Sequence, residues 1–232
     1  GDICKRVVEE KADFGIVVDP DVDRLAFISN DGEMFGEEYT LVACADYVLG
    51  KTKGNTVSNL SSSRALKDVT EKHGEQYFAS AVGEVNVVEK MKEVDAVIGG
   101  EGNGGVIFPA LHYGRDAMVG IALLLTYLAK RQLSLSELKI SYPDYTISKN
   151  KIDLGKNDRL ESLFDHIKGH YSAFGVSTID GVKIDFEDGW VHLRPSNTEP
   201  IIRVYAESKD EIKAGAYANE VIKLVKDFSS GK

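Results

Sequence analysis

Three aspartates stand at alternate positions directly after an apolar run, in the segment Asp19-Pro20-Asp21-Val22-Asp23-Arg24. If the backbone curls around a cation, their carboxylates can converge on it, and oxygen ligands suit Mg²⁺, Mn²⁺ or Ca²⁺. Without a cation the three negative charges repel each other. The segment does not match an EF-hand loop, because Arg24 stands where that loop needs Gly and Asn30 where it needs Glu. A metal site is the favoured interpretation, and a metal-dependent phosphatase with Asp19 as its nucleophile is the alternative.

A glycine-rich segment, Gly99-Gly100-Glu101-Gly102-Asn103-Gly104-Gly105, presents one carboxylate and one amide. Its glycines satisfy the dinucleotide pattern G-x-G-x-x-G. However, residues 106–109 are expected to be extended, so the helix N-terminus that would hold a pyrophosphate is missing. Glu101 and Asn103 suit hydrogen bonds to neighbouring hydroxyls of a sugar. From local sequence alone, a structural turn rich in glycine is an equally good interpretation.

The segment Arg194-Pro195-Ser196-Asn197-Thr198-Glu199-Pro200 combines a guanidinium, two hydroxyls and an amide between two expected strands. Such a run of donors favours a cradle for a phosphate dianion over a turn with two prolines. Arg203 lies just downstream and can add a second guanidinium.

Other polar residues are weaker candidates. Ser61, Ser62, Ser63 and Arg64 can hold a phosphate at a helix start, but an N-cap is the preferred interpretation. His112 and Arg115 lie close enough to the glycine-rich segment in sequence to share its site. The remaining histidines have no partner at ligand spacing and are assigned to the surface or to packing: His73, His166, His170 and His192.

Strands alternate with helices in the first part of the chain, which indicates an α/β architecture with a mixed sheet. Hydrophobic periodicity places strands at 14–18, 25–28, 56–60, 77–81 and 96–98, and helices at 38–49, 64–73, 86–93 and 116–131. The near-continuous apolar run at 14–18 is typical of a buried strand.

Beyond Pro143 the pattern changes to a smaller α+β module with an antiparallel sheet. Extended segments are expected at 145–153 and 201–205, an amphipathic helix at 157–168, and hairpin turns at Asp180-Gly181 and Asp188-Gly189. Residues 208–211 form a capping box that opens the last helix. With the polar connector at 51–55, these signals predict domains 1–50, 51–143 and 144–232.

Composition narrows the classes of function. The formal net charge of −9 argues against nucleic-acid and anionic-membrane partners, which need a basic surface. No apolar run approaches the roughly 18 residues of a membrane span. Two cysteines, Cys4 and Cys44, give neither a disulfide framework nor a metal spacing, so a cytoplasmic location is expected.

The three segments, in this order and spacing, resemble those of the α-D-phosphohexomutase family. Residues 19–24 are similar to its metal loop D-G-D-x-D-R, residues 100–104 to its sugar-recognition loop G-E-x-[SN]-G, and residues 194–200 to its phosphate loop R-x-S-x-T-E-P. The resemblance covers essentially the whole chain. It implies the end of the family's second domain (1–50), its third domain (51–143) and its fourth (144–232).

The resemblance implies a reaction and a role for each matched residue. A phosphoserine assisted by Mg²⁺ would exchange phosphoryl groups with a hexose phosphate through a hexose bisphosphate. Asp19, Asp21 and Asp23 would bind the metal, and Arg24 would neutralise the transferring phosphoryl group. Glu101 and Asn103 would bind sugar hydroxyls. The phosphate that is not being transferred would be held by Arg194, Ser196, Asn197 and Thr198, with Arg203 as an added guanidinium.

The sequence departs from the family pattern in three places. Gly105 stands where the family often has His, and Glu84 stands where a Lys commonly follows the glycine of a strand–helix turn. The phosphoserine loop, of the form T-A-S-H-N-P, occurs nowhere in the 232 residues. We therefore expect a C-terminal part of such an enzyme, inactive without the preceding domains. A non-catalytic sugar-phosphate binding module is the further alternative.

Overall fold

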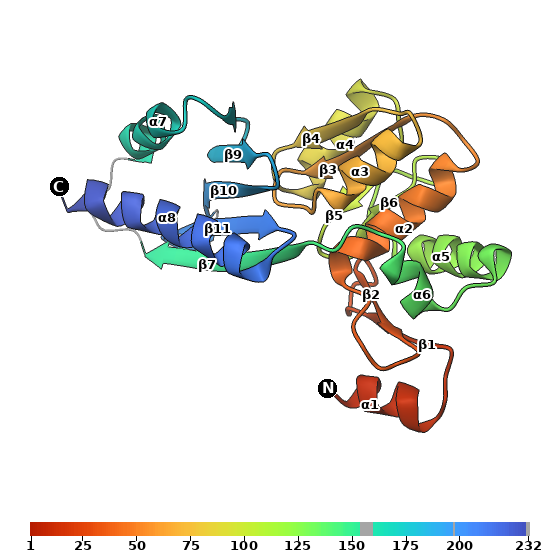
Figure 1. Ribbon diagram of the computed structural model, residues 1–232. Coiled ribbons are helices and arrows are strands. Elements are labelled where there is room, and N and C mark those ends of the chain that lie inside the picture. The colour runs from red at the N-terminus through yellow and green to blue at the C-terminus, as the bar shows by residue number, and fades with distance from the viewer. Residues whose placement is uncertain (154–159, 197, 231–232) are drawn as a thin grey trace. The chain divides into compact units, whose positions relative to one another are not determined.

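The computed structural model describes residues 1–153, 160–196 and 198–230 (Figure 1). They form two compact units, Gly1–Asp144 and Tyr145–Lys232. Within the described residues, every helix is too short or too polar to cross a membrane.

A four-stranded mixed sheet is the centre of the first unit. Its strands, in the order β4-β3-β5-β6, are Tyr77–Ser80, Asn55–Asn59, Ala96–Glu101 and Gly105–Ile107. β3 pairs in parallel with β4 and β5, whereas β6 pairs with β5 in the antiparallel sense. This confirms the mixed-sheet α/β class.

Helices cover both faces of this sheet. They are α2 (Glu37–Leu49), α3 (Ala65–Lys72), α4 (Glu84–Glu93) and α5 (Ala117–Arg131), whereas α6 (Leu135–Ile140) contacts strand β2 (Leu25–Ser29). α2 and α3 pack against each other and against the sheet, while α4 packs on the other side, as right-handed β3-α3-β4 and β4-α4-β5 crossovers require (Figure 1). The short α6 was not expected, although a capping box of Ser134 and Glu137 marks its start.

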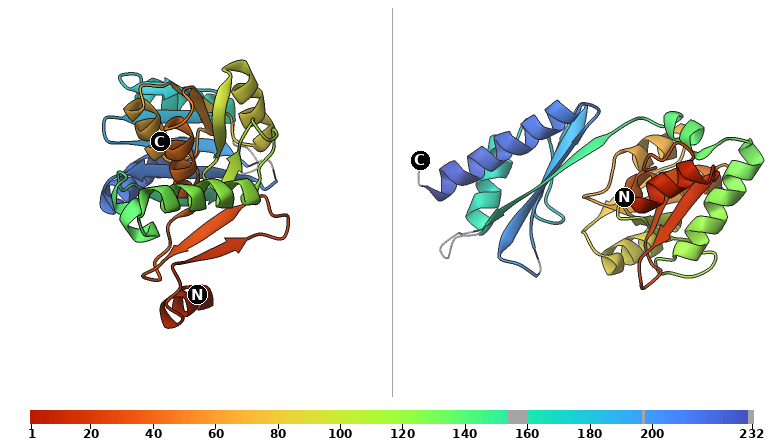
Figure 2. Two further views of the ribbon diagram at one scale, coloured as in Figure 1. Left: turned by 90° about the vertical axis from the view of Figure 1, so that its right-hand side faces the viewer. Right: turned by 90° about the horizontal axis from the view of Figure 1, so that it is seen from below.

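A two-stranded hairpin precedes this sheet. α1 (Asp2–Glu9) packs against the antiparallel strands β1 (Phe14–Val18) and β2 (Leu25–Ser29), which form a ribbon of their own (Figure 2). The expectation of a buried β1 is wrong, because Val17 and Val18 are about 40% exposed. β1 pairs with β2 alone among the described strands, so its other edge is unpaired, and the end of the strand is exposed.

The connector at 51–55 does not separate two compact units. α2 precedes it and is buried almost along its whole length, against α3, α5 and β5. On α2, the carboxylate of Asp46 accepts hydrogen bonds from Tyr127 (2.6 Å) and Tyr142 (3.0 Å) and contacts His73 (2.7 Å). α2 therefore belongs with the elements that follow residue 50.

The second unit is built on a five-stranded antiparallel sheet in the order β7-β11-β10-β9-β8, as expected. The strands are Thr146–Asp153, Ile201–Ser208, Gly189–Pro195, Val182–Phe186 and Gly175–Ser177. Its helices, among the residues that the structure describes, are α7 (Leu160–His170) and α8 (Glu211–Ser229). The start of the helix predicted at 157–168 lies outside the described residues.

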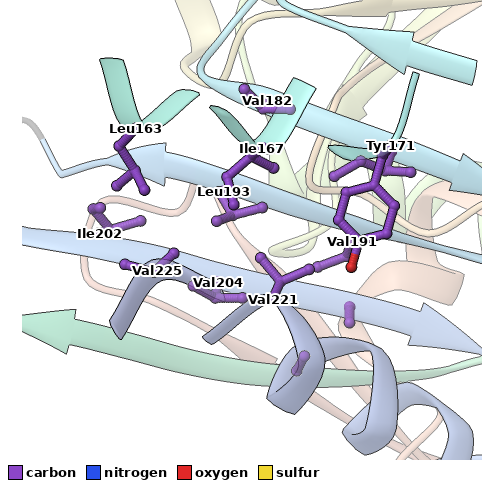
Figure 3. Packing of buried hydrophobic residues seen from close by; sticks show 13 residues of the cluster. Leu163, Ile167, Tyr171, Val182, Val191, Leu193, Ile202, Val204, Val221 and Val225 are labelled. Carbon is purple, nitrogen blue, oxygen red and sulfur yellow. The ribbon is translucent and has the colours of Figure 1, made fainter. Parts of the chain in front are cut away.

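α7 and α8 bury one face of this sheet (Figure 3). Leu163 and Ile167 from α7 and Val221 and Val225 from α8 meet the alternate residues of β10 and β11 in one apolar cluster. α8 begins two residues later than the predicted capping box at 208–211 implies. Asp210 caps α8 by accepting the N–H of Lys213 at 3.0 Å, because the preceding residues still pair in β11.

Candidate functional site

The first aspartate of the metal loop, residues 19–24, holds the loop in a tight turn. Oδ1 of Asp19 accepts the backbone N–H groups of Asp23 and Arg24, each at 3.2 Å. Between them Val22 has a φ of 56°, a left-handed conformation that is strained for a β-branched residue. The carboxylate at position 19 thus folds the backbone so that the carboxylate at position 23 comes back beside it.

One carboxylate oxygen of the metal loop has no hydrogen bond within the described residues. Oδ1 of Asp23 is buried and, within the described part of the chain, has no hydrogen-bond partner; Nε of Arg24 lies 3.9 Å away. Burial and the neighbouring Asp19 carboxyl raise the pKa of Asp23. Hydrogen bonds from the backbone N–H groups of Arg24 and Asp23 outweigh burial and lower the pKa of Asp19. Opposite shifts are typical of two carboxylates that share a site.

This donor set fits a divalent cation in part. Asp19 and Asp23 lie together, whereas Asp21 is exposed. Across the described ranges, no three His, Cys, Asp or Glu side chains already converge as a metal-binding group. Adjacent carboxylates with a buried oxygen that lacks a partner suit a hard cation such as Mg²⁺.

The sugar-recognition loop, residues 100–104, is a tight hairpin rather than a loose loop. β5 continues through Gly99 and Gly100 to Glu101, and β6 returns from Gly105. The side chain of Glu101 is only 7% exposed and is already bonded. Its Oε1 accepts Nδ2 of Asn59 at 2.9 Å and the N–H of Gly83 at 3.3 Å. The carboxylate expected to bind a sugar is therefore fixed in place by the protein.

The rest of the hairpin is tied to the start of α3. Oδ1 of Asn103 accepts the N–H of Gly105 at 3.1 Å, and Asn103 is partly exposed. The N–H of Gly102 donates to Oγ of Ser62 at 2.9 Å, and Ser62 in turn donates to Asn59 at 3.1 Å. Ser62 thus supports the sugar-recognition loop, a role that the N-cap interpretation missed.

The metal loop and the sugar-recognition loop lie side by side in the first unit. The N–H of Leu25, which follows the metal loop, donates to the carbonyl of Gly104 at 3.1 Å. The carbonyl of Val22 accepts the N–H of Ala117 at the start of α5, at 3.1 Å. Gly104 permits the first contact, because a Cβ there would lie 2.2 Å from the carbonyl oxygen of Leu25.

Arg115 joins the two loops through its side chain. Its guanidinium contacts Asp23 of the metal loop (Nη2–Oδ2, 2.5 Å), Glu84 (Nε–Oε2, 2.9 Å) and Glu101 of the sugar-recognition loop (Nη1–Oε2, 3.0 Å). From the sequence, Arg115 was only a candidate because it lies near the glycine-rich segment. Glu84 was noted only as a departure from the family pattern. His112, the other nearby candidate, instead contacts the helix cap Asp116 at 2.9 Å.

The phosphate loop, residues 194–200, lies in the second unit between β10 and β11. Nε of Arg194 is buried without a hydrogen-bond partner among the described residues, and Nη1 makes only a 3.5 Å contact to the carbonyl of Pro195. The hydroxyls of Ser196 and Thr198 lie 3.4 Å apart. Asn197 lies outside the described residues.

Arg203 faces Arg194 across the two strands. Its Nη2 lies 3.2 Å from the carboxylate of Glu199, and its Nη1 lies 3.4 Å from the hydroxyl of Tyr205. Two guanidinium groups and two hydroxyls gathered at one loop can bind a dianion by charge and by hydrogen bonds.

Two sequence models of one family match the chain. Residues 36–145 match "Phosphoglucomutase/phosphomannomutase, alpha/beta/alpha domain III", and residues 152–224 match "Phosphoglucomutase/phosphomannomutase, C-terminal domain". A phosphoglucomutase/phosphomannomutase of Thermococcus kodakarensis is 36% identical over 95% of this chain and 48% of its own length. A phosphoglucosamine/phosphogalactosamine mutase of Sulfurisphaera tokodaii is 37% identical over 93% and 48%.

Solved structures agree with this fold. A phosphoglucomutase/phosphomannomutase family protein of Burkholderia thailandensis superposes with a TM-score of 0.83 at 22% identity, over 99% of this chain and 49% of that one. An N-acetylphosphoglucosamine mutase of Aspergillus fumigatus, solved with GlcNAc-6P and magnesium, gives a TM-score of 0.67 at 15% identity, over 91% and 48%. The chain spans about half the length of the curated relatives it matches.

Proposed function

Since the chain belongs to the phosphoglucomutase/phosphomannomutase family, we propose that it supplies the metal, sugar and phosphate loops of a hexose phosphate mutase. Such an isomerase interconverts a hexose 1-phosphate and a hexose 6-phosphate. The observation that carries the proposal is the Leu25–Gly104 hydrogen bond, which keeps the metal loop beside the sugar-recognition loop. Phosphoryl transfer needs that proximity, because catalysis rests on positioning and on charge stabilisation.

The metal loop would act on the phosphoryl group that moves. Asp19, Asp21 and Asp23 would hold Mg²⁺, which would neutralise negative charge on the phosphoryl oxygens. Arg24 would add a guanidinium. Its nearest carboxylate oxygens, on Asp19 and Asp23, are 3.8 and 3.9 Å from Nε, so these ion pairs do not saturate it with hydrogen bonds.

The other two loops would hold the rest of the substrate. Glu101 would accept hydrogen bonds from sugar hydroxyls, and the amide of Asn103 would accept hydrogen bonds from them or donate to them. Arg194, Ser196, Asn197, Thr198 and Arg203 would hold the phosphate that is not transferred. A carboxylate and an amide both bond hydroxyl groups, so glucose, mannose and glucosamine phosphates all suit this chemistry.

The reaction requires a phosphoserine that is not among these 232 residues. In the proposed cycle, the free hydroxyl of the hexose phosphate attacks the phosphorus of the phosphoserine, the bond between phosphorus and the serine oxygen breaks, and the proton of the hydroxyl passes to the serine oxygen. The resulting bisphosphate reorients within the site and returns its other phosphoryl group to the serine. Because no T-A-S-H-N-P loop occurs in the sequence, we propose that the chain binds hexose phosphates but does not turn them over by itself.

Calorimetry and a coupled assay test the two halves of this proposal. With Mg²⁺ present, the chain should bind glucose 1,6-bisphosphate, and Arg194→Met should weaken that binding. A coupled assay for glucose 6-phosphate formation, with the bisphosphate added as activator, should show no turnover. Absence of binding would contradict the substrate class, whereas rapid turnover would contradict the need for an outside phosphoserine.

Mass spectrometry distinguishes the proposed mutase from the alternative phosphatase, in which Asp19 would be phosphorylated. The Oδ1 atom of Asp19 already accepts two backbone N–H groups, which suits a residue that shapes the loop better than a nucleophile. Incubation with acetyl phosphate and Mg²⁺ should therefore leave Asp19 unmodified. A phosphorylated peptide containing Asp19 would favour the phosphatase instead.

A further inference from the structure

Arg115 is the meeting point of three acidic segments that are far apart in sequence. Its side chain is 14% exposed and ion-paired with Asp23, Glu84 and Glu101, each on a different segment. The backbone N–H of Arg115 also donates to Glu84, at 3.3 Å. One positive charge is thus held by three negative ones. Because each of its three nitrogens contacts one of these carboxylates, the guanidinium is held in one orientation, and Arg115 acts through the carboxylates that it orients.

These ion pairs decide which carboxylate oxygens remain available. Arg115 takes Oδ2 of Asp23, and Oδ1 is the buried atom that lacks a hydrogen bond. On Glu101, Oε1 accepts from Asn59 and Gly83, whereas Oε2 accepts only from Arg115 among the hydrogen bonds found between described residues. A carboxylate offers about four acceptor positions, so Oε2 keeps room for one further donor. A single guanidinium therefore orients the expected metal ligand and the expected sugar ligand.

The position of Arg115 depends on the absence of a side chain at Gly105. A Cβ at that position would lie 2.4 Å from Cδ and 3.0 Å from Cγ of Arg115. No φ in the left-handed region is found for Gly105, so the glycine is needed there for space and not for backbone freedom. Gly105 and Arg115 thus form one structural unit.

We propose that Arg115 is a positioning residue that couples cation binding at the metal loop to hexose phosphate binding at the sugar-recognition loop. The coupling is reciprocal, because both loops bias the orientation of the same guanidinium. This inference rests on the proposed function. It adds a residue that determines how strongly the two binding events depend on each other.

Hydrogen exchange on the 232-residue chain without ligands tests the physical link. The informative amides are those of Asp23, Arg24 and Leu25 in or beside the metal loop and those of Gly102 and Gly105 in or beside the sugar-recognition loop, all of which are hydrogen-bonded. Arg115→Ala should speed exchange in both groups by about tenfold, as expected when charged hydrogen bonds are lost. Arg115→Lys, which keeps one charge but not the planar fork, should do so less strongly.

A control and a double variant make the test specific. Arg131→Ala removes the same charge from the far end of α5, where Nη1 contacts Tyr127 at 3.2 Å, and should leave both loops unchanged. Gly105→Ala should reproduce the effect of Arg115→Ala, because its methyl group displaces the guanidinium. When Arg115→Ala is already present, Gly105→Ala should speed hydrogen exchange hardly any further. Faster exchange in one loop only, or additive effects of Gly105→Ala and Arg115→Ala, would overturn the inference.

Added Mg²⁺ separates positioning from simple support of the fold. In the wild-type chain Mg²⁺ should slow exchange in both loops, whereas in Arg115→Ala it should slow the metal loop alone. Slowing of both loops in Arg115→Ala would mean that the Leu25–Gly104 bond carries the coupling, and would overturn the role of Arg115. If Mg²⁺ slows neither loop of the wild type, the proposed metal site fails. The ligand-free comparison still decides whether Arg115 links the loops.

Discussion

Arg194 on β10 and Arg203 on β11 are directly opposite each other in the antiparallel register of the second unit. Residues paired in this way project from the same face of the sheet, and like charges at such a pair are destabilising. Glu199 offsets part of the repulsion through its contact with Arg203. A dianion bound between the two guanidinium groups would therefore stabilise the folded chain, because it would offset the remaining repulsion.

This relationship predicts that inorganic phosphate stabilises the second unit. The melting temperature, followed by fluorescence of the single tryptophan Trp190, should rise with phosphate concentration because the anion binds the folded state. Arg194→Met should weaken the apparent phosphate affinity by about tenfold, which is the effect of losing one charged hydrogen-bonded pair. Lys223→Met, on the exposed side of α8, should behave as the wild type. Equal phosphate dependence in Arg194→Met and the wild type would contradict the anion site.

Gly104 should be intolerant of any side chain. Its φ of +87° is left-handed, and a Cβ would meet the carbonyl oxygen of Leu25 at 2.2 Å. We expect Gly104→Ala to lower the free energy of unfolding of the first unit by roughly 3 kcal/mol or more, since backbone strain and overpacking add. Gly74 is a matched control, because its φ is +78° and a Cβ there would meet no heavy atom of another part of the chain within 4 Å.

Gly74→Ala should cost only about 1–2 kcal/mol, the strain of the left-handed conformation alone. Urea unfolding followed by circular dichroism measures both variants. Equal losses in Gly74→Ala and Gly104→Ala would show that the contact between the two loops contributes nothing.

Asp46 should stabilise the first unit in a manner that depends on pH. Burial alone would raise its pKa, but hydrogen bonds from Tyr127, His73 and Tyr142 outweigh this and lower the pKa below the usual 3.8. A lowered folded-state pKa contributes stability that is present above the unfolded-state pKa and is lost as the pH falls through the folded-state value. Asp46→Asn should therefore cost about 2 kcal/mol at neutral pH and progressively less below pH 4.

Urea titrations at pH 7 and pH 3, followed by the near-ultraviolet signal of the tyrosines, check the effect of Asp46→Asn. Asp13→Asn removes an exposed carboxylate from the same unit and should leave stability nearly unchanged at both pH values. A loss in Asp46→Asn that is equal at both pH values would contradict the assigned cause.

The two cysteines should differ in reactivity. Cys44 on α2 is fully buried, and burial raises the pKa of its thiol to about 12, so almost no thiolate forms near neutral pH. Cys4 is partly exposed. Iodoacetamide at pH 8 should modify Cys4 alone in the folded chain and both residues in urea, as measured by mass spectrometry of the peptides. Equal labelling in the folded chain would mean that α2 is less protected than its packing indicates.

Periodicity and turn chemistry were sufficient to predict most of the elements. The parallel strands β3, β4 and β5 and the hairpins of the second unit lie where apolar runs and Asp-Gly turns place them, because those signals act over a few residues. Burial of β1 was not predictable in this way. An apolar run is compatible with a buried strand, but burial depends on which other elements cover it.

The positions of the metal, sugar-recognition and phosphate loops, and the chemical groups each offers, are properties of the amino-acid sequence alone. Only the tertiary structure shows that Gly104 meets Leu25, that Arg115 joins Asp23, Glu84 and Glu101, and that Arg194 faces Arg203. The physical reason is that residue types and spacing limit local conformation and ligand chemistry. Contacts between distant segments depend on the path of the chain, on strand register and on the space left where a glycine has no side chain.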